Sequence, residues 1–282
     1  MTPALVLRGL TKDFAVGRRG VRLRAVDQLS LRVEAGEVYG LLGANGSGKS
    51  TALKLVLGLL TPTAGECSIL GVSSRDAAAR RAVGYLPESP GLYRYLTGRE
   101  LVAFFGGLAG VRGAVLRARV DEVLGWAGLA AAADRRVGTY SQGMRQRLGL
   151  AQALVDRPRF LILDEPAAGV DAAGCAAQTA LIRRLRAEGT AVLLTSHLSD
   201  QIAAVCDRVG VLEQGRLVRE DSVATLAGEA EQLRLRGPEL APEDRAALER
   251  WLRVRGWTAE AAPGWPAGGA PAGLPGVFPG RN

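Results

Sequence analysis

Hydrophobic and polar positions divide the chain into three stretches. Residues 1–83 have the pattern of strands and turns that lead to a Gly-rich loop and a helix, and residues 84–156 have a mainly helical pattern. Residues 157–220 alternate apolar strands with helices. Strands that are apolar at every position favour a parallel sheet buried on both faces. The pattern therefore predicts an α/β fold into which a helical segment is inserted.

Two local signals support the helical segment. Thr97 and Glu100 have the spacing of a capping box, in which a hydroxyl and a carboxylate satisfy the first free amides of a helix. Apolar residues then recur at helical spacing at Leu116, Val120, Val123 and Ala127.

The C-terminal part has a different composition. Asp221 and Ser222 are suited to cap a short helix, residues 232–236 alternate like a strand, and Pro242 can open a helix with Leu248, Trp251 and Leu252 on one face. We expect a small α/β appendix at residues 226–257. Residues 258–282 are rich in Pro and Gly, which predicts a disordered tail.

Composition and charge narrow the class of protein. With 282 residues, 48% of them hydrophobic, the chain is too long and too apolar for a disulfide miniprotein or a disordered chain. The net charge of +8 suits nucleic acid, anionic lipid headgroups, or simply an Arg-rich surface. Cys67, Cys175 and Cys206 are odd in number and widely spaced, so we expect reduced core thiols in a cytosolic protein. We find no signal peptide and no apolar run suited to spanning a membrane.

A Gly-rich loop follows the strand-like segment 37–42 and precedes a helical run at 51–57. Its G-x-x-x-x-G-K-S pattern stands in the strand–loop–helix context of a phosphate-binding loop. Glycines let backbone amides approach a phosphate, and the following helix aims its positive end at the same place. Lys49 can reach the β- and γ-phosphates, and Ser50 can ligate Mg²⁺. Against a chance turn, we expect triphosphate binding by Gly43, Ala44, Asn45, Gly46, Ser47, Gly48, Lys49, Ser50 and Thr51.

Two carboxylates follow the apolar run 160–163. Acids at the end of a buried strand are costly unless a cation lies there, and bound Mg²⁺ supplies one. Asp164 would hold the metal and Glu165 would accept a proton from attacking water. The alternative is a strand end with two solvated acids. His197, the only histidine, follows another apolar strand at 191–194, where it would contact the γ-phosphate rather than serve a structural role.

Residues 140–147, Tyr-Ser-Gln-Gly-Met-Arg-Gln-Arg, have the pattern of a helix start. Ser141 is a good N-cap and Gly143 permits close approach, so the free amides form a second anion site. Since Lys49 already serves the γ-phosphate, this site is surplus unless a second copy brings its own nucleotide. The alternative is an ordinary capped helix.

This segment resembles the signature motif of ABC transporter ATPases. In chain order the resemblance covers the phosphate loop, the signature, residues 163–166, residues 168–171 as the D-loop and Ser196-His197 as the switch histidine, over about residues 3–225. It implies a P-loop ABC cassette with an antiparallel β subdomain and a helical subdomain at about 88–156. It also implies a head-to-tail dimer in which Lys49 of one copy faces Ser141 and Gly143 of the other across ATP and Mg²⁺. Asp171 falls in the D-loop, and Phe14 matches the aromatic that stacks on adenine, with core packing as its alternative.

Two departures point to a subclass. The signature reads Ser-Gln-Gly-Met, and Glu88 replaces the Q-loop glutamine that helps to hold the metal or water. Both features look like ABC-2-type exporter ATPases. Within that class, the segment that runs from residues 134–137 to residues 152–154 looks similar to the ATPase of the copper-processing system that serves nitrous oxide reductase.

The resemblance implies an ATP-hydrolysing exporter subunit. It would act as a homodimer or heterodimer on the cytoplasmic face of the cell membrane. A separate transmembrane permease would contact the region 88–95. No nucleic acid is expected as a partner. The alternative is a soluble non-transport ABC ATPase that acts on ribosomes or nucleic acid, which the net charge supports. Such relatives usually carry two cassettes or a long coiled-coil insert, and neither is visible here.

Overall fold

The computed structural model describes residues 2–16, 21–196 and 199–225. Residues 2–225 belong to one compact unit. The predicted appendix at 226–257, the predicted tail at 258–282 and His197 lie outside the described residues.

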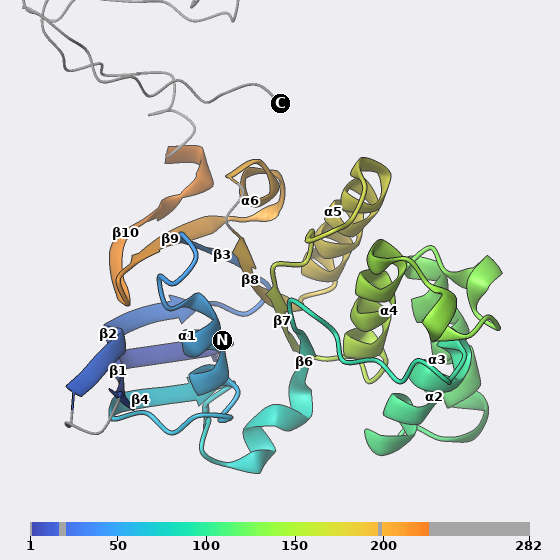
Figure 1. Cartoon of the computed structure of the whole chain (residues 1–282), viewed down its shortest axis with the longest axis horizontal. Helices are drawn as coiled ribbons and strands as arrows, with labels where there is room; N and C mark the ends of the chain where they lie inside the picture. The colour runs from blue at the N-terminus through green and yellow to red at the C-terminus, as the bar shows by residue number, and fades with distance from the viewer. Residues whose placement is uncertain (1, 17–20, 197–198, 226–282) are drawn as a thin grey trace, which may run out of the picture. The chain divides into compact units, whose positions relative to one another are not determined.

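A four-stranded antiparallel sheet forms the first layer (Figure 1). It contains β1 (Leu5–Val16), β2 (Val21–Val33), β4 (Ala64–Ile69) and β5 (Val72–Ser73) in the order β2-β1-β4-β5. The antiparallel β subdomain implied by the resemblance is therefore present.

The second sheet has six strands in the order β10-β9-β3-β8-β7-β6. Five of them run parallel, and β10 pairs antiparallel with β9 at one edge, so the sheet is mixed. The strands are β3 (Val38–Leu42), β6 (Val83–Leu86), β7 (Phe160–Asp164), β8 (Ala191–Ser196), β9 (Arg208–Glu213) and β10 (Arg216–Ser222). Every residue of β7 and β8 is buried, as the uninterrupted apolar runs predict.

Three helices gather beyond β6 (Figure 1): α2 (Gly98–Leu108), α3 (Gly113–Trp126) and α4 (Gln142–Leu154). Thr97 and Glu100 form the predicted capping box at the start of α2. Val120 and Val123 of α3 and Ala127 at its C-cap are buried, and Leu116 is partly buried, which agrees with the helical spacing. The other helices are α1 (Lys49–Val56), α5 (Ala172–Ala187) and α6 (Ser199–Val205), with 3-10 turns at Ala77–Ala82, Ala130–Ala132 and Val137–Thr139.

The main core contains residues of the first sheet, of α1 and of the second sheet. Leu5, Leu53, Tyr39 and Phe160 represent these elements, and each is at most 1% exposed. Burying a side chain of this size stabilises the fold by about 1.5–3 kcal/mol. This core fixes the carboxyl ends of β3 and β7, from which the functional loops emerge.

The cysteine prediction is confirmed for two of the three thiols. Cys67 and Cys206 are buried, whereas Cys175 is only partly buried because it lies in the first turn of α5. All three are free thiols. Among the described residues, no helix is both long enough and apolar enough to cross a membrane.

Candidate nucleotide site

The phosphate loop connects β3 to α1, as the sequence pattern predicts. Gly46 and Gly48 have φ angles of +80° and +108°, a region that favours glycine. A Cβ atom on Gly48 would collide with the carbonyl oxygen of Ala25. A Cβ atom on Gly43 would collide with the side chain of Ser47. The loop therefore needs glycine at these positions for steric as well as conformational reasons.

The N-terminus of α1 has the properties of an anion site. Gly48 occupies the cap position without a side-chain cap, and no acidic residue lies in the first turn. The helix amides are therefore left for a ligand, and the helix dipole favours a negative one. The Ser47 hydroxyl is buried without a hydrogen-bond partner among the described residues, and Ser50 is exposed. These features fit a phosphate group.

Lys49 lies inside the loop with only 6% of its surface exposed. Its Nζ donates to the carbonyl oxygens of Gly43 at 2.5 Å and Ala44 at 3.2 Å. The same atom lies 3.8 Å from Oε1 of Glu165. The structure thus brings together the predicted phosphate lysine and the predicted catalytic base.

Asp164 and Glu165 stand at the carboxyl end of β7. Thr195 on β8 connects them, because its hydroxyl donates to Oδ1 of Asp164 at 2.6 Å and accepts from the N–H of Glu165 at 3.1 Å. Burial raises the pKa of Asp164, and the Thr195 hydrogen bond opposes that rise. Glu165 has a φ of +48°, unusual for a residue other than glycine, at the point where the chain leaves the strand.

Sequence reasoning assigned no role to Thr195. It is the residue before Ser196 on a strand parallel to β7, and the register pairs it with Asp164. The signal was present in principle, since polar residues at the carboxyl ends of adjacent parallel strands meet at one edge. Strand adjacency, however, is a property of the fold. Gln178 was also missed; its amide donates to the carbonyl oxygen of Pro166 at 3.1 Å and holds the segment after Glu165.

The predicted signature segment begins α4, and Ser141 caps this helix by accepting a hydrogen bond from the N–H of Met144 at 3.2 Å. A Cβ atom on Gly143 would lie 3.0 Å from the carbonyl oxygen of Gly169. Asp171 caps α5 by accepting from the N–H of Gly174 at 2.8 Å. Within one chain the signature segment therefore packs against the D-loop segment, and both have capped helix starts.

Phe14 and Glu88 lie outside this cluster of contacts. Phe14 is partly exposed on β1, and the Nζ of Lys12 lies 5.2 Å from its ring centroid. Glu88 is exposed in the segment between β6 and α2. In the part of the chain that the structure describes, no group of three His, Cys, Asp or Glu side chains could hold a metal ion. The assignment of Ser50, Glu88 and Asp164 as Mg²⁺ ligands stays a prediction.

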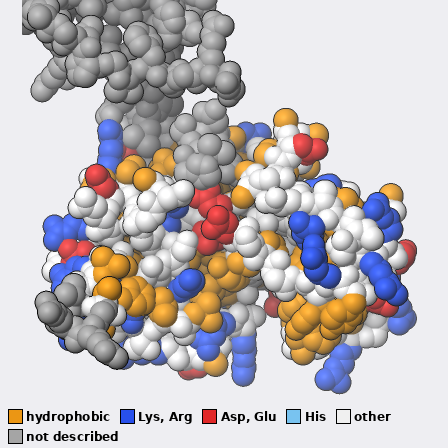
Figure 2. Space-filling view, viewed as in Figure 1, with side chains coloured by type: hydrophobic (Ala, Val, Ile, Leu, Met, Phe, Trp, Pro, Cys, Tyr) orange, Lys and Arg blue, Asp and Glu red, His pale blue; other side chains and the backbone are white. Residues whose placement is uncertain are grey.

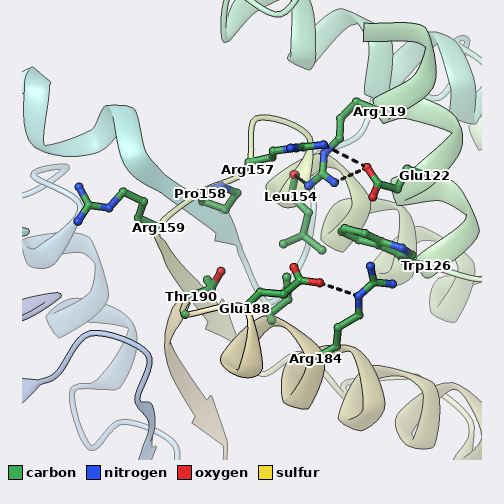
Figure 3. Close-up of a pocket in the computed structure, with 12 residues that line it drawn as sticks. Arg119, Glu122, Trp126, Leu154, Arg157, Pro158, Arg159, Arg184, Glu188 and Thr190 are labelled. Atoms are coloured by element: carbon green, nitrogen blue, oxygen red, sulfur yellow. Dashed lines mark hydrogen bonds and ion pairs between the residues drawn. The ribbon is translucent and has the colours of Figure 1, made fainter. Parts of the chain in front are cut away.

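A separate hollow of about 510 Å³ lies at the opposite edge of the second sheet (Figure 3). Arg159 and Thr190 immediately precede β7 and β8, so the hollow is at the amino ends of these strands. The guanidinium groups of Arg119 and Arg184 lie 4.6 and 4.5 Å from the ring centroid of Trp126. Arg119 and Arg184 also pair with Glu122 and Glu188, respectively. Nucleotides bind at the carboxyl ends of strands in α/β folds, so this hollow is not the nucleotide site.

The fold and the loop geometry define a P-loop nucleotide-binding cassette. The ABC transporter family profile matches residues 26–168. An uncharacterized ABC transporter ATP-binding protein of Nostoc is 40% identical over 255 residues, which cover 89% of this chain and 75% of that protein. The chain belongs to the ABC transporter ATP-binding proteins and is an ABC ATPase that hydrolyses ATP.

Two further matches are informative. The Nod factor export ATP-binding protein I of a Rhizobium species is 38% identical, over 80% of this chain and 73% of that protein. Among solved structures, the dimeric post-hydrolysis state of the cassette MJ0796, bound to ADP and Pi, aligns with a TM-score of 0.72 at 25% identity. That alignment covers 78% of this chain and 98% of the cassette. The predicted α/β ABC cassette fold is confirmed.

Proposed function

We propose that this chain is the ATP-hydrolysing subunit of an ABC-2-type exporter, peripheral on the cytoplasmic face of the cell membrane. The Leu-Pro-Glu segment at 86–88 and the Tyr-Ser-Gln-Gly-Met segment at 140–144 support the subclass. The Rhizobium relative, named for Nod factor export, supports export as the direction. We infer that the permease selects the cargo; the similarity to a copper-processing ATPase and the Nod factor relative suggest different cargoes.

The proposed chemistry assigns one task to each group. Bound Mg-ATP supplies the phosphoanhydride bond and the cation that offsets its charge. The amides of residues 43–51 and the Nζ of Lys49 bind the phosphates. Ser50 and Asp164 hold the metal, and Glu165 accepts a proton from the attacking water. The 3.8 Å separation between Nζ of Lys49 and Oε1 of Glu165 supports this assignment, because it puts the proposed base beside the ammonium group that would bind the phosphates.

The proposed dimer follows from the signature helix. The free amides of α4 begin at the Ser141 cap and form an anion site on the same chain as the phosphate loop. In a head-to-tail pair, Ser141 and Gly143 of one copy would close over the ATP held by Lys49 of the other. Phe14 would stack on adenine, His197 would contact the γ-phosphate, and Glu88 and Asp171 would complete the site.

The observation that carries the transport part of the proposal is an exposed aromatic cluster. It consists of the aromatic side chains Tyr93, Tyr95 and Phe104 together with Leu108, which is on the same helix α2 as Phe104; Tyr95 and Leu108 are 69% and 68% exposed. The ring centroid of Tyr93 lies 5.9 Å from that of Tyr95 and 5.8 Å from that of Phe104. Figure 2 shows hydrophobic side chains gathered over this part of the surface, around α2. Contiguous exposed apolar side chains of this kind mark an interaction site.

The proposed permease would dock on this aromatic cluster, which includes Tyr93 and Tyr95 of the region 88–95 that follows β6. The test is co-expression with a tagged candidate membrane protein of the ABC-2 permease type, followed by purification through that tag. We expect wild-type chain to co-purify and Tyr95→Ala with Phe104→Ala to be lost. Val115→Ala, which alters a 69% exposed valine on α3, is the matched control.

The alternative function would give a different result. A chain that binds ribosomes or nucleic acid in a salt-sensitive complex, and that does not co-purify with the membrane protein, would favour the non-transport ATPase. Equal recovery of the aromatic and Val115 variants would show that the cluster is not the docking surface.

A further inference from the structure

The turn between β9 and β10 lies against the phosphate loop. Gln214 and Gly215 have φ angles of +47° and +81°, and the residues that flank them, Glu213 and Arg216, lie opposite each other in the β9–β10 strand register. Positive φ at both central residues is typical of the tight two-residue hairpin turn that matches the twist of its strands. The N–H of Gly215 donates to the carbonyl oxygen of Ser47 at 2.8 Å. The turn therefore contacts the backbone of the loop directly.

The same turn also contacts β2. The N–H of Asp27 donates to the carbonyl oxygen of Gly215 at 2.9 Å. A Cβ atom on Gly215 would lie 2.8 Å from the carbonyl oxygen of Ala25, and a Cβ atom on Gly48 would collide with that same oxygen. Three backbone segments thus meet with no room for a side chain between them.

An ion-pair cluster fastens this junction. The buried carboxylate of Asp27 accepts from Arg216 at 2.6 Å through Oδ2 and from Arg24 at 3.1 Å through Oδ1. Arg216 immediately follows Gly215, so its pairing with Asp27 holds the turn in place. Arg24 also donates to Asp13 at 2.9 Å, which ties β1 into the cluster.

We propose that Asp27 and Arg216 are positioning residues for phosphate binding. The carbonyl of Ser47 and the N–H of Gly48 belong to one planar trans peptide, so they point in opposite directions. A turn that holds the Ser47 carbonyl on one side therefore directs the Gly48 N–H to the other. The Asp27–Arg216 pair sets the orientation of that amide through Gly215 without contacting the nucleotide. This inference rests on the proposal that residues 43–51 bind the phosphates.

The test measures nucleotide affinity in the full chain. Calorimetric titration with Mg-ADP and with pyrophosphate at 15 °C gives Kd for Asp27→Asn, Arg216→Gln and the double variant, with thermal unfolding measured in parallel. We expect each single variant to raise both Kd values about fivefold, and the double variant to raise them no further than Asp27→Asn alone, because both changes weaken the same Asp27–Arg216 contact. Arg216→Lys, which keeps the charge, stays within twofold of wild type.

Asp221→Asn is the matched control, because it removes a carboxylate that pairs with Arg219 at 2.6 Å on the same strand β10. It should leave both Kd values unchanged. Unchanged Kd values in Asp27→Asn and Arg216→Gln would overturn the inference, as would an equal loss in the control. If Asp27→Asn does not fold, Arg216→Gln still decides the matter, since that side chain is 70% exposed.

Lys49→Ala separates the two levels of the argument. If Lys49→Ala binds pyrophosphate as tightly as wild type, the proposed phosphate site is wrong. If Lys49→Ala loses binding while Asp27→Asn and Arg216→Gln keep it, the site stands and only the positioning role fails.

Discussion

Replacement of Thr195 by valine tests the most buried contact of the proposed catalytic edge. Thr195 is 0% exposed, and its hydroxyl lies 2.6 Å from Oδ1 of Asp164. Valine preserves the shape of threonine and removes only the hydroxyl. The lost hydrogen bond is one to a charged group, which contributes about 1.5–3 kcal/mol to stability. Glu165 keeps the second acceptor of its N–H, the Thr195 carbonyl oxygen at 3.2 Å, so the backbone after β7 should not rearrange.

We therefore expect Thr195→Val to lower the free energy of unfolding by about 2 kcal/mol, measured by urea denaturation without nucleotide. The ATPase rate should fall about tenfold, as is typical when a group that orients a metal ligand is removed. Thr190→Val is the control, because Thr190 precedes the same strand β8 and makes no side-chain hydrogen bond among the described residues.

The reasoning about Thr195 is refuted if the two threonine variants unfold at the same urea concentration. A normal ATPase rate in a destabilised Thr195→Val would keep the stabilising role of Thr195 and remove its proposed role in orienting Asp164 for turnover.

Three further predictions follow from the site and the core. Glu165→Gln should bind ATP normally yet turn over at less than about 1% of the wild-type rate in a phosphate-release assay, since the amide cannot accept the water proton; normal turnover would contradict the assignment of the base. In the native chain, Ellman's reagent should modify Cys175 first, because burial raises the pKa of Cys67 to about 11 and that of Cys206 to about 12; modification of all three at one rate would be inconsistent with the packing. The hydrogen bond from Arg216 lowers the pKa of Asp27 below its ordinary 3.8, so its contribution to stability is present above that value and is lost as pH falls through the folded-state pKa. The gap in urea midpoint between wild type and Asp27→Asn should be constant at pH 5–8 and close in stronger acid; a gap that persists there would exclude the charge as its source.

Several features were fixed by the sequence because their physics is local. The loop pattern at 43–50 requires glycines, a lysine and a helix start within eight residues, and all lie within one contiguous segment. The caps predicted at Thr97 and Ser141 depend on hydrogen bonds that span three residues, and both form in the structure. The run 160–163 predicted a fully buried strand for the same reason.

Only the tertiary structure decided which distant segments meet. Thr195 reaches Asp164 because β8 lies beside β7. The order of strands in a sheet does not affect the hydrophobic pattern of either segment, so the sequence could not predict this contact. Gly215 reaches Ser47 from 168 positions further along the chain, where the local sequence signals no more than a tight turn. A buried hydrogen bond or ion pair between remote residues depends on how whole sheets pack, whereas a cap or a phosphate loop depends on neighbours in the chain.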